Sequence, residues 1–234
     1  MRLALIIPIQ NRAQTIEESL LALAEVRQRG HHIIVVDAGS SDNGAARARA
    51  LADRVVVASQ GLSSQLNAAT RVPEAEQADA LVFLPESVRL PEQADRAIAR
   101  ALSNSASPWG RFDVSYRNCH GATSRPLDLA AALANWCSRA TGICTWEQAI
   151  FVSRSVFFAL EGFAVTTQCA DIEFSCRARQ LGAPIVVRER ALVSTSEAGS
   201  AAVLRTAIRR EWQRMAVAIG FEPLVRSSAH QSPF

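Results

Sequence analysis

The first half of the chain alternates between short apolar runs and longer segments with one apolar face. Nearly continuous apolar runs predict buried strands, and helical periodicity with caps and stops predicts the helices between them. Thr15 is an expected N-cap with Glu18 at the capping-box position, and Gly30 is the expected stop. The runs predict strands at 2–9, 32–37, 54–59 and 79–84, and helices at 15–30, 45–52, from about 63, and 91–102.

The second half changes character but keeps the alternation. Expected strands are 109–117, one that begins near 147, and 183–193; expected helices are a short one capped by Ser153, then 126–142, 169–182 and 201–220. Strands that alternate with helices of ten or more residues indicate an α/β fold, with a mostly parallel sheet covered by helices on both faces. No internal repeat or linker interrupts the pattern, so we expect one domain over residues 1–234.

Polar residues follow three of the predicted strands. They form the tips Pro8–Asn11, Asp37–Asp42 and Pro85–Ser87. In open parallel sheets, ligands bind beyond the carboxyl ends of the strands. We therefore expect these three tips to form one site.

Composition narrows the chemistry. All 25 basic residues are arginine, which excludes a Schiff-base lysine, pyridoxal phosphate attachment and a P-loop lysine. A net charge of +3 gives no indication of nucleic-acid binding, which usually needs many more cations on one face. Five cysteines without a CxxC pair indicate free thiols in a reducing compartment. No signal peptide and no apolar run of about 20 residues occurs, so the expected location is cytoplasmic.

Other enzyme classes lack their motifs. No GxGxxG follows the first strand, which argues against a dinucleotide-binding oxidoreductase. No GxSxG elbow supports Ser-His hydrolysis.

Six motifs in order resemble the family 2 glycosyltransferases of the GT-A fold, in the compact bacterial subgroup without transmembrane helices. They are "IIPIQN", "IIVVDAGSSDNG", "LNAA", "WGRFDV", "EQAIFVSRSVFFALEGF" and "ADIEFSCRARQLG". The resemblance covers nearly the whole chain. It implies a Rossmann-like GT-A domain with a nucleotide-binding half, 1–105, and an acceptor-binding and catalytic half, 106–234.

The resemblance also implies roles for particular residues. The family's acid after the second strand contacts the nucleotide base, and here it is Asp37; its alternative role is to cap the turn. Gly39 and Ser40 would let the backbone approach the nucleotide. The nucleotide-binding set is Pro8, Asn11, Asp37, Gly39, Ser40 and Asn67, where Asn67 could equally be a polar residue on a helix face.

The metal-binding motif of the family is degenerate here. Ser87 occupies the aspartate position, and Glu86, displaced by one residue, is the only acid in the loop. A hydroxyl is a poor ligand for Mg²⁺ or Mn²⁺, so metal binding should be weak or absent, with Glu86 the only candidate ligand. Arginines could stabilise the diphosphate instead. The candidates for diphosphate or acceptor contacts are Glu86, Ser87, Arg89, Arg111, Glu147, Gln148, Arg209 and Arg210.

Asp171 keeps the position of the family's catalytic base, although the glutamate usual before it is Ala170. The implied function is transfer of a sugar from a nucleoside-diphosphate donor to a glycan, lipid or small hydroxyl acceptor, with inversion. The alternative is a non-catalytic domain of the same fold that binds a nucleotide, a glycan or a protein partner. Peripheral contact with the inner membrane stays open, because arginines flank the apolar face of the last helix.

Overall fold

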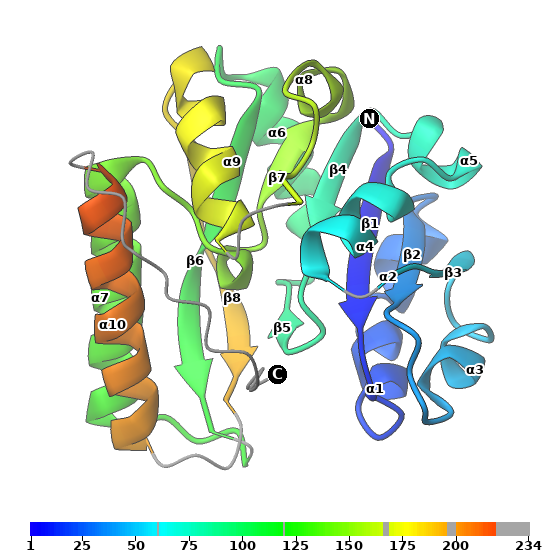
Figure 1. The fold of residues 1–234 in the computed structure, drawn as a ribbon, viewed down its shortest axis with the longest axis horizontal. Helices are drawn as coiled ribbons and strands as arrows, with labels where there is room; N and C mark the ends of the chain where they lie inside the picture. Colours follow the sequence, from blue (N-terminus) through cyan, green and yellow to red (C-terminus); the bar gives the residue numbers. More distant parts are fainter. Residues whose placement is uncertain (60, 119, 166–168, 196–199, 219–234) are drawn as a thin grey trace.

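The protein forms one eight-stranded mixed sheet, seen in the computed structural model, which describes residues 1–59, 61–118, 120–165, 169–195 and 200–218 (Figure 1). The strand order is β3-β2-β1-β4-β7-β6-β8-β5. The strands are β1 (Leu3–Ile9), β2 (His32–Asp37), β3 (Arg54–Val57), β4 (Ala80–Phe83), β5 (Val88–Arg89), β6 (Trp109–Arg117), β7 (Phe151–Ser153) and β8 (Ile185–Ser194). Cys119 and the predicted helix end at 219–220 lie outside the described residues.

The first four strands in the order are parallel, as the sequence pattern predicts. β7 runs antiparallel between β4 and β6, whereas β6 and β8 are again parallel. β5, which has no counterpart among the predicted strands, pairs antiparallel with β8 through Val88 and Val193. This short strand fastens the loop after β4 to the second half of the chain.

Helices cover both faces of the sheet, which confirms the predicted fold class. They are α1 (Ile16–Leu21), α2 (Ala24–Gln28), α3 (Gly44–Ala48), α4 (Leu62–Ala69), α5 (Pro73–Glu76), α6 (Ala94–Ser103), α7 (Arg125–Thr141), α8 (Arg154–Ala159), α9 (Ala170–Ala178) and α10 (Ser200–Ala218), with the 3-10 helices η1 (Trp146–Gln148) and η2 (Arg179–Leu181). Figure 1 shows α7 and α10 side by side at one edge, and α1 and α3 at the opposite edge.

The core has two layers, one on each face of the sheet. Leu3, Leu5 and Ile7 of β1 belong to one layer, and Ala4 and Ile6 belong to the other. Successive strand residues point to opposite faces, so a strand covered on both sides must be apolar throughout. The first layer also takes residues from α1, α2, α6, α7 and α10, and the second takes residues from α4, α5, α8 and α9.

The helix predicted at 15–30 is two helices. A turn between α1 and α2 interrupts it, and Leu20, Leu23 and Val26 nevertheless all stay buried. Thr15 is the N-cap residue, but it adopts helical dihedral angles rather than the extended ones of a capping residue, so its side chain makes no capping bond. Ser153 likewise precedes α8 without a capping bond.

No described helix is long and apolar enough to cross a membrane.

Candidate functional site

The turn after β2 is built around Asp37. Its buried carboxylate accepts hydrogen bonds from the backbone N–H groups of Gly39 (3.2 Å) and Ser40 (3.0 Å), and from the Ser40 hydroxyl. Gly39 has a φ of +80°, which an L side chain rarely adopts. Asp37 therefore acts as the cap of this turn, and its carboxylate is held rigidly at the end of the strand.

Asn11 joins the tip of β1 to the same turn. Its backbone N–H donates to the Ser40 hydroxyl at 2.8 Å, and its side-chain oxygen accepts from the backbone N–H of Ser41 at 2.9 Å. The residue has a φ of +53°, a conformation that asparagine tolerates better than most residues. Pro8 lies in β1 opposite Val36 of β2. Two of the predicted tips are thus one hydrogen-bonded unit.

The third tip, Pro85–Ser87, reaches the first one through charge and backbone contacts. The Glu86 carboxylate lies 3.7 Å from Nε of Arg12, the residue after Asn11. The Glu86 carbonyl accepts from the hydroxyl of Ser19, and the Ser87 carbonyl accepts from the N–H of Ser194 at the end of β8. All three predicted tips are therefore brought together at the carboxyl ends of adjacent strands.

A divalent cation, which the fold family implies at this loop, does not fit the side chains present. The loop offers one carboxylate and one hydroxyl, and the carboxylate of Glu86 already faces the guanidinium of Arg12. Hard cations need several oxygen ligands, and a nearby positive charge opposes their binding. No cluster of three or more His, Cys, Asp or Glu side chains among the described residues could hold a metal ion.

Asn67 of α4 makes contacts within the protein with both ends of its side-chain amide. Its nitrogen donates to the Phe163 carbonyl at 2.7 Å, and its oxygen accepts from the Phe163 N–H at 3.0 Å. These bonds tie α4 to the segment before α9. Gln65, two residues earlier, is buried and donates to the carbonyls of Ile9 and Val36, so it holds β1 and β2 together just below the tips.

Asp171 lies in the first turn of α9 and is 8% exposed. Its two carboxylate oxygens accept from the backbone N–H groups of Ile172 (2.9 Å) and Trp146 (3.2 Å). Burial raises the pKa of Asp171 above the ordinary aspartate value, and these N–H groups and the charge of Arg210 oppose that rise. A carboxylate with this environment is suited to accept a proton.

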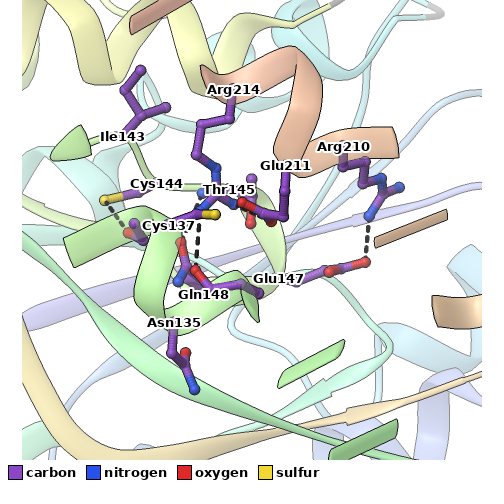
Figure 2. Close-up of polar contacts among 12 residues, drawn as sticks. Asn135, Cys137, Ile143, Cys144, Thr145, Glu147, Gln148, Arg210, Glu211 and Arg214 are labelled. Carbon is purple, nitrogen blue, oxygen red and sulfur yellow. Dashed lines mark hydrogen bonds and ion pairs between the residues drawn. The ribbon is translucent and has the colours of Figure 1, made fainter. Parts of the chain in front are cut away.

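Glu147 connects η1 to Arg210 of α10, as Figure 2 shows. One of its oxygens accepts from the Tyr116 hydroxyl at 2.6 Å, and the other pairs with Nη1 of Arg210 at 2.5 Å. The pKa of Tyr116 is raised by burial and by Glu147. The negative charges of Glu147 and Asp171 both act on Arg210 and balance its positive charge within the protein. This internal pairing disfavours Arg210 as a ligand of the donor diphosphate.

Gln148 of η1 lies buried near two buried polar side chains of α10, Glu211 and Arg214 (Figure 2). The Gln148 oxygen accepts from the Thr145 N–H, which completes a capping box, while its buried Nε2 has no hydrogen-bond partner among the described residues. Arg214 donates to the Ala134 carbonyl and pairs with Glu211 at 3.1 Å. Burial raises the pKa of Glu211. Gln148 therefore anchors η1 from inside rather than facing solvent.

The other candidate arginines have different surroundings. Arg111 is fully buried and pairs with Asp113 at 2.7 Å, so the interior holds it and a diphosphate in solvent cannot reach it. Arg209 is exposed on α10. Arg89 pairs with Glu18 at 2.9 Å, and its buried Nη1 has no hydrogen-bond partner in the part of the chain that the structure describes.

Sequence reasoning missed Arg12, Gln65 and Tyr116, and it gave no particular role to Asp42, the last residue of the second predicted tip. Asp42 accepts from the N–H groups of Ala13 and Gly44, which lowers its pKa and pins the two loops together. The available sequence signal for Arg12 was its place directly after Asn11, at the end of the first predicted strand. A pocket of about 530 Å³, lined by residues such as Thr141, Arg179 and Pro184, contains none of the predicted site residues.

The strand order and the two helical layers identify the fold. A mixed, mostly parallel sheet between two helical layers, with a polar site at the strand ends, is the GT-A fold of nucleotide-sugar transferases. Residues 4–73 match the family model for glycosyl transferase family 2, which confirms the resemblance over the first three of the six motifs. No curated protein matches the chain.

Solved structures show how far the likeness extends. A mannosyltransferase from Pyrobaculum calidifontis, in complex with GDP-Man and Mn²⁺, is 19% identical with a TM-score of 0.66, over 94% of this chain and 64% of that one. Glucosyl-3-phosphoglycerate synthase from Mycobacterium tuberculosis, with Mn²⁺ and UDP, is 16% identical with a TM-score of 0.64, over 95% and 81%. TarS from S. aureus, with UDP-GlcNAc, is 14% identical with a TM-score of 0.63, over 92% and 67%.

These identities are low, so the likeness establishes the fold. The chain spans less than two thirds of the mannosyltransferase's own length.

Proposed function

We propose that the protein is a glycosyltransferase that moves a sugar from a nucleoside diphosphate to a hydroxyl group, with inversion at the anomeric carbon. The observation that carries the proposal is the unit formed by Asn11, Asp37, Gly39 and Ser40 at the carboxyl ends of β1 and β2. Nucleotides bind at such a position in open α/β sheets. The solved relatives support it, because their structures were determined with GDP-Man, UDP or UDP-GlcNAc.

In this mechanism, Asp171 is the general base. As the acceptor oxygen forms its bond to the anomeric carbon, the bond from that carbon to the diphosphate oxygen breaks, and the hydroxyl proton passes to the Asp171 carboxylate. The nucleoside diphosphate leaves with the bonding electrons. Direct displacement of this kind inverts the anomeric configuration. The raised pKa of Asp171 improves it as a proton acceptor.

The acceptor side favours a neutral hydroxyl compound. Around Arg210, the carboxylates of Glu147 and Asp171 leave no excess positive charge for an anionic acceptor. Peripheral contact with an anionic membrane remains a prediction, supported by the exposed Ile208 and Trp212 beside arginines on α10, and testable by co-sedimentation with anionic vesicles.

A thermal-shift panel of nucleoside diphosphates and nucleotide-sugars tests the proposal. A ligand that binds only the folded protein raises the melting temperature by mass action. We expect at least one nucleoside diphosphate to raise it, and Asp37→Ala to weaken that binding by about 1–3 kcal/mol, since the carboxylate orders the turn. Asp128→Ala, on the exposed side of α7, is the matched control. A wild type that responds to no nucleotide would contradict the proposal.

A non-catalytic binding domain is the second candidate. Ser87 favours it, because the aspartate that the family resemblance implies as a metal ligand is missing at this position. Binding of a nucleotide-sugar without transfer or donor hydrolysis across a broad acceptor panel would select this candidate.

A further inference from the structure

The loops after β1 and β4 meet at a positively charged side chain, that of Arg12. Arg12 directly follows Asn11, and Glu86 follows β4, the strand that pairs with β1. Their side chains meet at 3.7 Å, between Nε and Oε2. A guanidinium therefore stands beside the loop carboxylate at the edge of the sheet where the proposed function places the diphosphate.

Arg12 has its backbone fixed and its side chain available. The Arg12 carbonyl accepts from the N–H groups of Thr15 (3.2 Å) and Ile16 (3.0 Å), so the residue is anchored at the start of α1. Among the described residues, its guanidinium has Glu86 as its ionic partner and donates no hydrogen bond. At 3.7 Å, this single contact is a loose ion pair that leaves the guanidinium donors for a ligand.

The competing arginines lack this combination. Arg111 is enclosed in the interior with Asp113, and Arg210 is neutralised by Glu147. Arg89 lies in β5 and pairs with Glu18 of α1. Of these four arginines, Arg12 alone directly follows the nucleotide-side turn formed by Asn11, Ser40 and Ser41.

Resting on the proposed function, we propose that Arg12 binds the donor diphosphate in place of a divalent cation, so that nucleotide binding is independent of metal. Guanidinium presents a planar fork of N–H donors that matches phosphate oxygens and keeps its charge at every working pH. In the transferase reaction it would stabilise the charge that develops on the diphosphate as the sugar leaves. Glu86 holds the guanidinium in position until the ligand arrives.

Isothermal titration of the full chain tests this. A nucleoside diphosphate that binds, and its matching nucleoside, are titrated with EDTA and again with Mn²⁺. We expect the wild type to bind the diphosphate in EDTA, with less than about a tenfold gain from Mn²⁺. Arg12→Gln should weaken diphosphate binding about tenfold or more, and it should leave nucleoside binding unchanged, because the nucleoside lacks the phosphates.

Two further variants separate charge from fold. Arg12→Lys, which keeps the positive charge, should recover part of the lost affinity. Arg27→Gln removes an exposed arginine that pairs with Asp53 in the same half and should bind like the wild type.

Two outcomes would overturn the inference while leaving the proposed function intact: a gain of tenfold or more from Mn²⁺ in the wild type, or unchanged diphosphate affinity in Arg12→Gln. Absence of nucleotide binding under both conditions would contradict the proposed function, and the role of Arg12 with it.

Discussion

At the residue scale, sequence motifs locate the candidate side chains but not their partners. The position of Asp171 at the start of a helix was predictable, because "ADIEFS" follows a segment without helical pattern. Its burial and its bond from the Trp146 N–H were not, since Trp146 is 25 residues away in the chain. The same is true of Asn67 and Phe163, which are 96 residues apart.

The environment of Asp171 predicts a pH-dependent stability difference. Because burial raises its folded-state pKa, folding favours the protonated form, and its contribution to stability falls as pH rises from the unfolded value of about 3.9 through the folded value. Asp171→Asn removes this dependence. Melting temperatures of both proteins are measured between about pH 4 and 8. As the pH rises, the melting temperature of Asp171→Asn should increase relative to that of the wild type. A difference that stays constant over this range would contradict the raised pKa.

At the element scale, β1, β2 and β4 were predictable because they are buried on both faces and therefore nearly continuously apolar. The antiparallel insertion of β7 and the two-residue β5 were not predictable, since both depend on pairing between distant segments rather than on local pattern. The link between η1 and α10 also depends on contact between distant segments of the chain, so it was not predictable either. Glu147 and Arg210 are 63 residues apart, and neither has a local feature that indicates the other.

The pairing of η1 with α10 predicts how firmly α10 is held. Glu147→Gln removes the charge that pairs with Arg210 and weakens the bond from Tyr116, so α10 should open more often. Native-state hydrogen exchange over residues 202–216 measures this, and we expect faster exchange in the variant.

Tyr116→Phe is the matched control, because it removes the hydroxyl and leaves the ion pair. It should change exchange in α10 less than Glu147→Gln does. If both variants exchange like the wild type, the ion pair does not hold α10.

At the scale of the whole molecule, the sequence predicted the fold class and the convergence of three strand tips, because parallel strands place their carboxyl ends along one edge. It did not predict which arginine lies there. The predicted candidates were Arg89, Arg111, Arg209 and Arg210, whereas the packing of α1 against the loop after β4 brings Arg12 to Glu86. The division into a nucleotide half and an acceptor half remains a prediction.

The central claim is that the chain transfers sugar with Asp171 as base. The most direct measurement is release of nucleoside diphosphate from the nucleotide-sugar that binds best, in the presence of an acceptor panel, by wild type and by Asp171→Asn. We expect turnover by the wild type and a loss of about a hundredfold or more in the variant, with nucleotide affinity unchanged, because removal of a general base typically costs about 10²–10⁴ in rate. Equal turnover by the two proteins would contradict the role of Asp171, and absence of turnover by the wild type from every donor would contradict the transferase itself.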